Sequence, residues 1–291
     1  MPGLREIVDE PSWTQKHASS RGDDEASARR EELARATAGS LMRTIEVEVI
    51  PRLLLVHGVM ATGPRWGGSV TRTDVESLTS QLLSRSEPNF DLFLAEIEGR
   101  GVGVEAICLD LLAPSARLLG IMWEQDLVEF TDVTVGLSRL QRLLHQISAR
   151  FEREEDHPVS GQTILLTATP GEQHTFGLSL VGEFFRRAGW DVCDEMPETG
   201  AQVTEFSRRR WLSAIGFSLS SEVLLDRLAS VIRDVRVHSR NRDIGILVGG
   251  SVFQGHPEWV ASVGADATAL DGRQAVVQAQ SLCRLMATKS R

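Results

Sequence analysis

Three short segments in the second half of the chain carry the residue types that could bind a ligand. They span residues 171–177, 218–220 and 249–251. In the first segment, an imidazole could ligate a transition metal while a carboxylate two residues earlier orients its ring. The other segments offer hydroxyl groups for hydrogen bonds and paired glycines that let a ligand approach the backbone. Each segment alone is common in loops, as a surface histidine, a helix cap or a turn, so the interpretation depends on their combination.

The elements around these segments are predicted to form a parallel sheet. Five stretches have the composition of buried strands, namely residues 163–167, 190–193, 214–217, 244–248 and 265–270. Three stretches between and after them have helical patterns, namely 178–188, 222–237 and 273–286. Alternating strands and helices favour a parallel sheet that is covered on both faces, and such sheets bind ligands at the carboxyl ends of their strands. Because all three segments directly follow a predicted strand, we expect them to meet at one edge.

The order and spacing of these residues resemble the cobalamin-binding module of methionine synthase, corrinoid methyl-transfer proteins, carbon-skeleton mutases and corrinoid photoreceptors. That module has Asp-x-His-x-x-Gly, then Ser-x-Leu or Ser-x-Thr, then Gly-Gly. Here the order is Glu172-x-His174-x-x-Gly177, forty residues, Ser218-x-Ser220, twenty-eight residues and Gly249-Gly250. Two positions depart from the motif. Glu172 replaces Asp, which we expect to lengthen or re-angle the hydrogen bond to the histidine, and Ser220 replaces an apolar residue or Thr.

The resemblance implies a mode of cofactor binding. His174 would ligate cobalt in place of the cofactor's own benzimidazole, with Glu172 orienting the imidazole. The displaced nucleotide tail would lie in a slot beside the paired glycines, where the Ser218 hydroxyl would bond the freed base. Gly177 would let the next helix begin close to the corrin. The expected contacts in these loops are Glu172, Gln173, His174, Thr175, Phe176, Gly177, Ser218, Leu219, Ser220, Gly249, Gly250 and Ser251.

The segment before the sheet is predicted to be an antiparallel helical bundle. Apolar residues recur there at helical spacing, and the connections between the stretches are short. Thr73 or Asp74 is expected to cap the first helix, Gly99-Arg100-Gly101 to end the second, and Pro114 to begin a new helix after the third. The last helix is expected over residues 131–154.

Part of this bundle resembles the helical cap that covers the upper corrin face in the same superfamily. Residues 119–126 and 130–141 carry the resemblance, which is closest to the AerR/PpaA antirepressors of photosynthesis genes in purple bacteria; residues 50–53 fit that group too. The resemblance implies that Trp123 lies over the corrin, and a place in the bundle core is the alternative. Light-sensing corrinoid repressors enclose an adenosyl group with Glu-His ten residues after this Trp. Here Val133-Thr134 stand there, which favours aquo- or hydroxo-cobalamin over the adenosyl form.

Composition limits the class of protein. The chain has 40 acidic and 31 basic residues and a formal charge of −9, which repels phosphate backbones and argues against autonomous nucleic-acid binding. The basic run Arg208–Arg210 is predicted to be a solvated helix face. The three cysteines lie far apart, the first 30 residues lack a signal-peptide core, and the longest apolar stretch, near residues 53–61, is too short for a bilayer. We therefore expect a soluble cytoplasmic protein without membrane contact.

Together these features predict a flavodoxin-like (Rossmann-type) parallel-sheet cobalamin domain preceded by an all-α bundle. The expected parts are a disordered tail (1–30), a helix and loop (31–70), a helical-bundle cap (71–157) and the α/β domain (158–291). The resemblance implies a light- or redox-responsive regulator, not an enzyme, that acts as an antirepressor through a repressor protein of the photosynthesis-gene type. The alternatives are a corrinoid carrier in a methyltransferase system and a haem-binding redox sensor on the same fold.

Overall fold

The computed structural model describes residues 68–151 and 160–289. The chain divides into two compact units, Met1–Arg65 and Trp66–Arg291, and the description covers the second. The predicted tail, the helix and loop before residue 68 and the motif at residues 50–53 lie outside the described residues. The boundary expected between bundle and α/β domain falls in the undescribed segment 152–159, so the predicted domain limits stay predictions.

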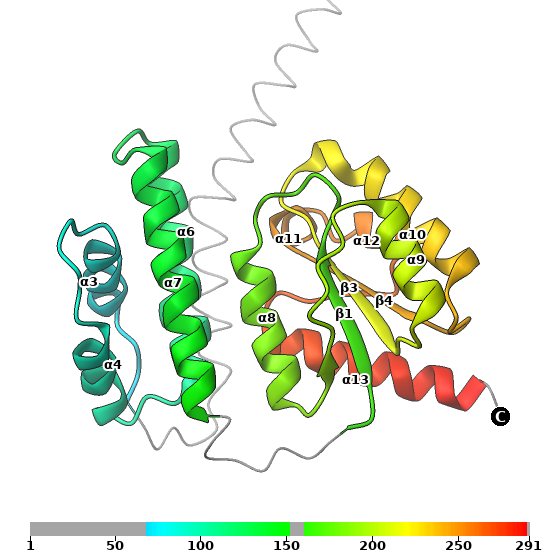
Figure 1. Ribbon diagram of the computed structural model, residues 1–291, viewed down its shortest axis with the longest axis horizontal. Helices are drawn as coiled ribbons and strands as arrows, with labels where there is room; N and C mark the ends of the chain where they lie inside the picture. The colour runs from blue at the N-terminus through cyan, green and yellow to red at the C-terminus, as the bar shows by residue number, and fades with distance from the viewer. Residues whose placement is uncertain (1–67, 152–159, 290–291) are drawn as a thin grey trace, which may run out of the picture. The chain divides into compact units, whose positions relative to one another are not determined.

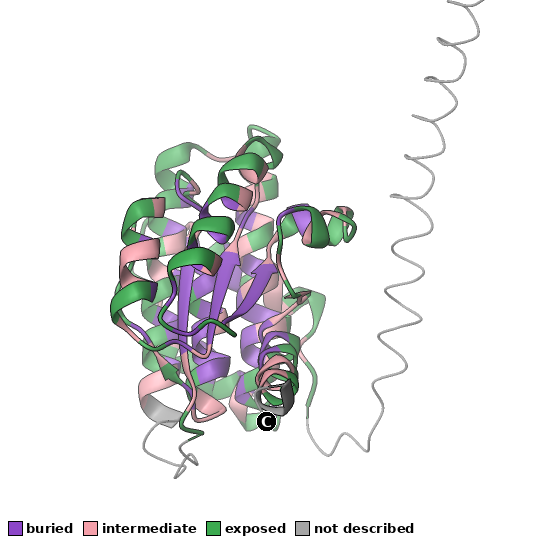
Figure 2. Cartoon of the chain, turned by 90° about the vertical axis from the view of Figure 1, so that its right-hand side faces the viewer, coloured by how far each residue is buried: buried purple, intermediate pink, exposed green. Residues whose placement is uncertain are grey.

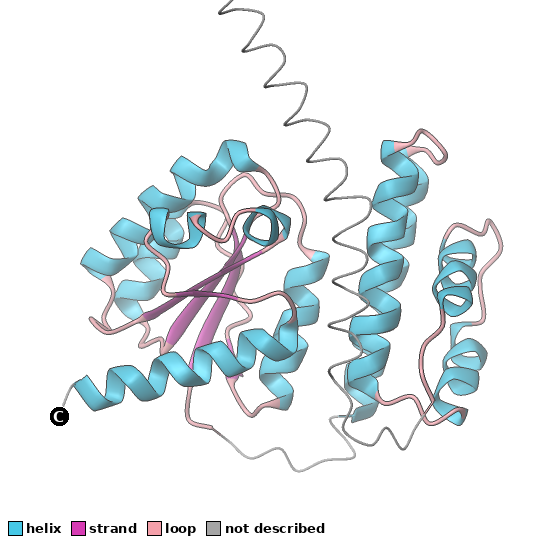
Figure 3. Ribbon diagram, turned by 180° about the vertical axis from the view of Figure 1, so that it is seen from behind, coloured by secondary structure: helices cyan, strands magenta, loops and turns pink. Residues whose placement is uncertain are grey.

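The first described part is helical, as the sequence predicts (Figure 3). Its core is formed by side chains that recur at helical spacing, among them Leu78, Leu94, Leu111 and Leu140, all fully buried. The elements are α3 (Arg72–Leu82), α4 (Phe90–Gly99), α5 (Val104–Ala106), η2 (Ile107–Leu112), α6 (Ala113–Glu124) and α7 (Phe130–Phe151).

The cap of the first helix differs from the prediction. Thr71, not Thr73 or Asp74, is the N-cap of α3, and its hydroxyl accepts a hydrogen bond from the Asp74 backbone N–H. The Asp74 carboxylate in turn accepts from the Thr71 backbone N–H at 2.8 Å. This reciprocal capping box satisfies two N–H groups that a helix otherwise leaves unpaired. The helix therefore begins at Arg72, because its cap lies two residues before the predicted Thr73.

Pro114 lies in the first turn of α6, as predicted, but α6 is not separated from the helical residues before it. Residues Val104–Glu124 form one continuous helix whose middle, η2, is π-helical. The Ala113 N–H there donates to the Cys108 carbonyl, five residues back. Proline has no N–H to donate and its ring crowds the preceding turn; the wider π-turn lets the chain pass Pro114 without stopping.

This continuous helix is long and apolar enough to cross a membrane by length and composition alone. It was not counted among the apolar stretches of the sequence, because Pro114 was expected to divide it into two helices. Its apolar side chains Ile107, Leu111, Leu112 and Leu119 are fully buried in the bundle core. Burial of this kind is also what the core helix of a non-membrane domain requires, so packing accounts for the composition.

The second described part is a five-stranded, fully parallel sheet with the order β2-β1-β3-β4-β5 (Figure 1). This is the flavodoxin-like order, and the predicted fold class is confirmed. The strands are β1 (Thr163–Ala168), β2 (Asp191–Val192), β3 (Ala214–Ser218), β4 (Gly245–Gly249) and β5 (Ala267–Thr268). The helices are α8 (Phe176–Arg187), α9 (Gly200–Arg209), η3 (Glu222–Leu224), α10 (Leu225–His238), α11 (Ser251–Gly255), α12 (Trp259–Ser262) and α13 (Gly272–Lys289).

The central strands are buried on both faces (Figure 2). Two consecutive residues of β1 show why, because their side chains point to opposite faces of the sheet. Leu166 packs in the core that α8 and α13 cover, and Leu165 packs in the core that α9 and α10 cover. Of helix α9, the sequence predicted only that the basic run at its end lies on a helix face, without the bounds of the helix. Its signal was a second capping box, in which Thr199 and Gln202 bond each other's backbone N–H groups.

Candidate functional site

The three predicted ligand-binding segments lie side by side at the carboxyl edge of the sheet. The register pairs Ala168 with Ser218, and Ser218 with Gly249, so that the loops after β1, β3 and β4 start from adjacent positions. The chain crosses to β2 after β1 and to β4 after β3, which makes the β1/β3 boundary the point where the strand order reverses. Open α/β sheets bind ligands in the crevice at this point.

At this edge, His174 is presented to solvent by a buried carboxylate. The His174 side chain is 73% exposed, whereas that of Glu172 is 3% exposed. His174 Nδ1 lies 2.5 Å from Glu172 Oε1. The expectation that the longer Glu side chain lengthens this hydrogen bond is therefore wrong. The same oxygen accepts from the backbone N–H groups of Gln173 and His174 at 2.9 and 3.0 Å, so the loop is folded around the carboxylate.

Glu172 also links the first loop to the second. Its Oε2 accepts a hydrogen bond from the Ser220 backbone N–H at 2.6 Å. Burial alone would raise the pKa of Glu172, but the hydrogen bonds from the His174 and Ser220 N–H groups and from the imidazole together lower that pKa below its usual value. An ionised carboxylate can only accept, so the Nδ1 of His174 must carry the proton. The Nε2 lone pair is then free to bind a metal.

Further backbone contacts fasten the three loops together. Thr169, a buried residue that the sequence analysis did not single out, donates to the Ser218 carbonyl from both its backbone N–H and its hydroxyl. The Leu219 N–H donates to the Gly249 carbonyl at 2.9 Å, and the Ser251 hydroxyl reaches the Ser220 carbonyl at 3.5 Å. The loops are thus held in place by the protein itself, which lowers the ordering cost of binding a ligand.

Besides Glu172, two of the expected contacts have buried side chains. Leu219 is fully buried and Phe176 is 9% exposed, and both belong to the core clusters of the domain. Any contact that these two residues make with a cofactor therefore passes through their backbone atoms. Gln173 and Gly177 are exposed, and Thr175 is half-buried as the N-cap of α8.

The glycines differ in what the fold requires of them. Gly250 has φ +109°, and a Cβ there would lie 2.1 Å from the Leu219 carbonyl oxygen, so the fold itself demands glycine. A Cβ on Gly249 would meet only the Ala269 carbonyl oxygen, at 3.7 Å, and one on Gly177 would meet nothing within 4 Å. The packing of the domain therefore does not require glycine at positions 249 and 177.

Exposed apolar side chains also follow strands at the same edge, and they were not among the ligand contacts predicted from the sequence. Met196 follows β2, Val223 follows β3 and Leu270 follows β5, and all three are mostly exposed. Exposed apolar groups around a few convergent polar groups are typical of a cofactor site. Their only sequence signal was their position a few residues after a strand.

In the bundle, Trp123 is not a core residue. It is 46% exposed in the last turn of α6, with its ring tilted at 60° to that of Phe130 and 6.2 Å between centroids. Ile121 and Leu127 are also exposed, so these four residues form an apolar tip where α6 leads into α7. The alternative that Trp123 fills the bundle core is wrong. Its place over a corrin stays a prediction.

The residues that stand where photoreceptor repressors have Glu-His are arranged differently. Val133 is buried in the bundle core, and the Thr134 hydroxyl donates to the Phe130 carbonyl of its own helix. Within residues 68–151 and 160–289, no three His, Cys, Asp or Glu side chains are grouped to hold a metal ion. The donor set at the sheet edge is a single oriented imidazole, which fits a metal held mainly by a macrocycle, as in a corrin or a haem.

Comparison with known proteins finds similarity in sequence and in fold. Residues 162–280 match the B12 binding domain family. The chain is 27% identical over 176 residues to an uncharacterized 20.5 kDa protein from the bchF-crtJ intergenic region of Rhodobacter capsulatus, an alignment that covers 60% of this chain and 91% of the relative. The fold resembles the monomethylamine corrinoid protein of Methanosarcina barkeri, with a TM-score of 0.59, 14% identity, and coverage of 74% of this chain and 100% of the other.

Proposed function

We propose that this protein is a cobalamin-loaded regulator that controls transcription through a partner repressor, because residues 162–280 match the B12 binding domain family. The observation that carries the proposal is the exposed His174 imidazole, whose Nδ1 is engaged by Glu172 and whose Nε2 is left for cobalt. The similarity to the protein from the bchF-crtJ intergenic region of Rhodobacter capsulatus supports the regulatory group that the sequence resembles.

The residues at the carboxyl edge suit cobalamin in its benzimidazole-displaced form. His174 Nε2 would bind the lower face of the cobalt, and the ionised Glu172 would keep the ring in the required tautomer and raise its basicity. The displaced nucleotide tail would lie beside Gly249, a position at which the fold itself does not require glycine. The Ser218 hydroxyl would form a hydrogen bond with the freed base. Met196, Val223 and Leu270 would contact the apolar parts of the corrin.

The bundle would act as the cap. When bound, cobalamin supplies a cobalt whose upper ligand changes with light or redox state. The apolar tip around Trp123 would cover that face and report the change. With Val133 turned into the core and Thr134 bonded to its own helix, the chain lacks the adenosyl-enclosing pair, which favours aquo- or hydroxo-cobalamin. A partner senses the change only if it binds the two cap states with different affinity.

The cofactor proposal is tested at His174. Hydroxocobalamin titrated into the full chain should bind with the absorption change of benzimidazole displacement, and His174→Ala should lose or severely weaken this binding. His256→Ala is the matched control, since His256 is also a loop histidine paired with a glutamate, Glu258. Normal affinity and an unchanged spectrum in His174→Ala would remove this residue from the cobalt. Tight binding of haem in preference to hydroxocobalamin would favour the haem alternative.

The regulatory role is tested separately. The protein alone should not shift a DNA probe at moderate salt, because the chain is acidic. It should bind a photosynthesis-type repressor with an affinity that depends on cobalamin or illumination. Sequence-specific DNA binding by the isolated protein would contradict this role. The fold is also that of a corrinoid protein, so methyl transfer from the bound corrinoid to a thiol by a dedicated methyltransferase would favour the carrier alternative.

A further inference from the structure

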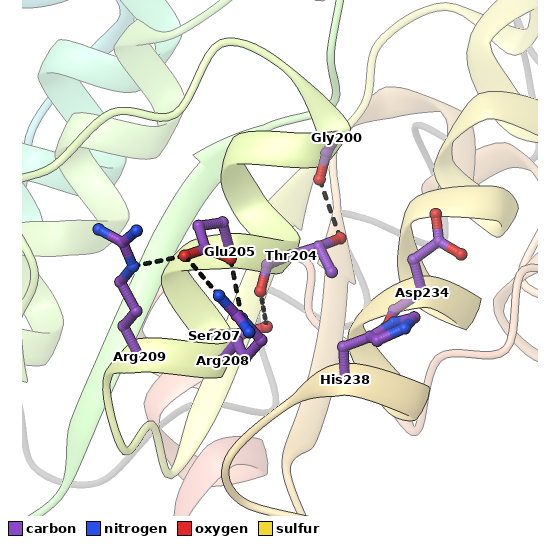
Figure 4. A network of polar contacts seen from close by, with 8 residues as sticks. All are labelled: Gly200, Thr204, Glu205, Ser207, Arg208, Arg209, Asp234 and His238. Carbon is purple, nitrogen blue, oxygen red and sulfur yellow. Dashed lines mark hydrogen bonds and ion pairs between the residues drawn. The ribbon is translucent and has the colours of Figure 1, made fainter.

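A basic surface lies at the edge of the sheet opposite His174. Helices α9 and α10 each follow a strand and run back along the sheet, so both end at its amino edge. The run predicted to be a solvated helix face, Arg208–Arg210, occurs there, and Arg208 and Arg209 are indeed exposed in the last turn of α9. Figure 4 shows α9 beside α10, with Glu205, Arg208 and Arg209 on the first helix and His238 on the second.

This surface, which we name the basic edge, consists of residues 205–212 and 237–243. Three hydrogen bonds join the two stretches. The Arg240 N–H donates to the Ser207 carbonyl at 2.9 Å, the Arg240 guanidinium to the Arg209 carbonyl at 3.4 Å, and the buried Asn241 amide to the Leu212 carbonyl at 2.8 Å. The basic edge is therefore a single preformed surface.

The charge of the basic edge is opposite to that of the chain. Arg210 is neutralised by Asp191 and Glu195, at 2.9 and 3.6 Å. Together with these two carboxylates, the surface has five arginines against four carboxylates, a net charge of +1; the other arginines are Arg208, Arg209, Arg240 and Arg242, and the other carboxylates are Glu205 and Asp243. Glu205 is shared by two of the guanidinium groups (Figure 4). Excess positive charge is thus concentrated here in a protein whose net charge is −9.

Two large apolar side chains lie among these arginines. Trp211 and Val237 are each 56% exposed, although the backbone on either side of them is fixed by the hydrogen bonds above. The fold does not need a tryptophan at this place, since the side chain that enters the core from this turn is that of Leu212. Tryptophan and arginine together are the residue types that most often dominate binding energy at protein interfaces.

We propose that the basic edge binds an acidic segment of a partner protein that carries an apolar residue for Trp211. A short acidic segment meets only the local positive field, because charges are screened beyond about 8 Å at physiological salt. A nucleic-acid duplex would extend past the basic edge and meet the acidic remainder of the chain. This inference deepens the proposed regulatory role and rests on it for the view that the partner is a protein.

The test uses the full chain and a fluorescein-labelled peptide of alternating Glu and Leu residues, with a Gln-and-Leu peptide and a labelled DNA duplex as comparison probes. We expect the Glu peptide to bind most tightly. Trp211→Ala and the double variant Arg209→Glu/Arg240→Glu should each weaken it by about tenfold or more, as interface anchors do. The matched control is Arg72→Glu/Arg142→Glu, which changes the net charge equally on bundle helices and should stay within about twofold of the wild type.

Circular dichroism and urea unfolding of each variant show whether it is still folded, and Arg209→Gln provides a milder change if the double variant is not. Equal binding of the Gln and Glu peptides, unchanged binding in Trp211→Ala, or tighter binding of the duplex would each overturn the inference. Because His174 and the basic edge lie at opposite edges of the sheet, the two proposals fail separately. His174→Ala should lose hydroxocobalamin and keep the peptide, whereas the basic-edge variants should do the reverse.

Discussion

Replacing Glu172 by Gln tests how the protein orients its metal ligand. The carboxylate accepts four hydrogen bonds, three at Oε1 from the first loop and one at Oε2 from the Ser220 N–H. Glutamine has the same shape but only one accepting oxygen, and its amide nitrogen donates. The less costly orientation keeps the three bonds at Oε1 and sets the new NH₂ group against the Ser220 N–H.

The expected cost follows from these contacts. A hydrogen bond to a charged group contributes about 1.5–3 kcal/mol, and here it is replaced by two donors that face each other. The free energy of unfolding of the cofactor-free protein should therefore fall by about 2 kcal/mol at neutral pH. The imidazole also loses the negative charge that raises its basicity, and loss of such an orienting partner costs about 10- to 100-fold in metal affinity. We expect that loss in the affinity for hydroxocobalamin.

The pH dependence has a defined sign. The folded state lowers the pKa of Glu172 below its usual 4.5, so its stabilisation is fully present above that value. The stabilisation is lost as the pH falls from 4.5 through the lower folded pKa. The difference in unfolding free energy between wild type and Glu172→Gln should therefore be constant near neutral pH and shrink in acid.

Urea unfolding of the cofactor-free protein and spectrophotometric titration with hydroxocobalamin measure the two effects. Glu172→Asp is the control, because it keeps the charge and has the residue of the family motif; its affinity should stay within about tenfold of the wild type. If Glu172→Gln binds hydroxocobalamin as tightly as the wild type, with the same spectrum, the carboxylate does not orient the ligand and the reasoning fails.

Substitutions at the paired glycines, Gly249 and Gly250, and at Trp123 give further predictions. Gly250→Ala should destabilise the protein by at least about 2 kcal/mol in urea unfolding, since it combines a positive φ with a clash against Leu219. Gly249→Ala should cost less than about 1 kcal/mol. Equal costs would contradict the inference that the fold requires glycine only at position 250. Gly249→Phe should abolish hydroxocobalamin binding while circular dichroism stays native, and normal binding would place the nucleotide tail elsewhere. Trp123→Ala should change the rate of upper-ligand exchange or the light response while the unfolding free energy falls by less than about 1 kcal/mol, because the ring is half exposed; unfolding of the bundle would instead show a structural role.

Local patterns were sufficient to predict the sheet. Strands such as β1 and β4 are continuous apolar runs, and the turn residues after them mark where they end, so the parallel α/β fold and its ligand edge followed from nearest neighbours in the chain. The motif from Glu172 to Gly250 was equally readable, because its members sit at fixed distances from strand ends. The match of residues 162–280 to the B12 binding domain family agrees with this.

Other features depended on residues that are distant in the sequence. Pro114 predicted a break, yet burial of Ile107, Leu111 and Leu112 in one bundle core holds the helix continuous through a π-turn. The bounds of helix α9 were not predicted because the helix is mostly polar, and its burial comes from packing against residues of α10 that are distant in the sequence.

At the site, the sequence determined which residues are present, and the tertiary structure decided what each one does. The spacing placed Gly249 and Gly250 together, but only the approach of the Leu219 carbonyl shows that one glycine is demanded by the fold and the other is not. Likewise, the sequence brought Glu172 near His174, but the hydrogen bond from Ser220, 48 residues away, holds the carboxylate buried and ionised. A local pattern fixes the torsions and neighbours of one segment, whereas burial and long-range hydrogen bonds arise only when separate segments are packed together.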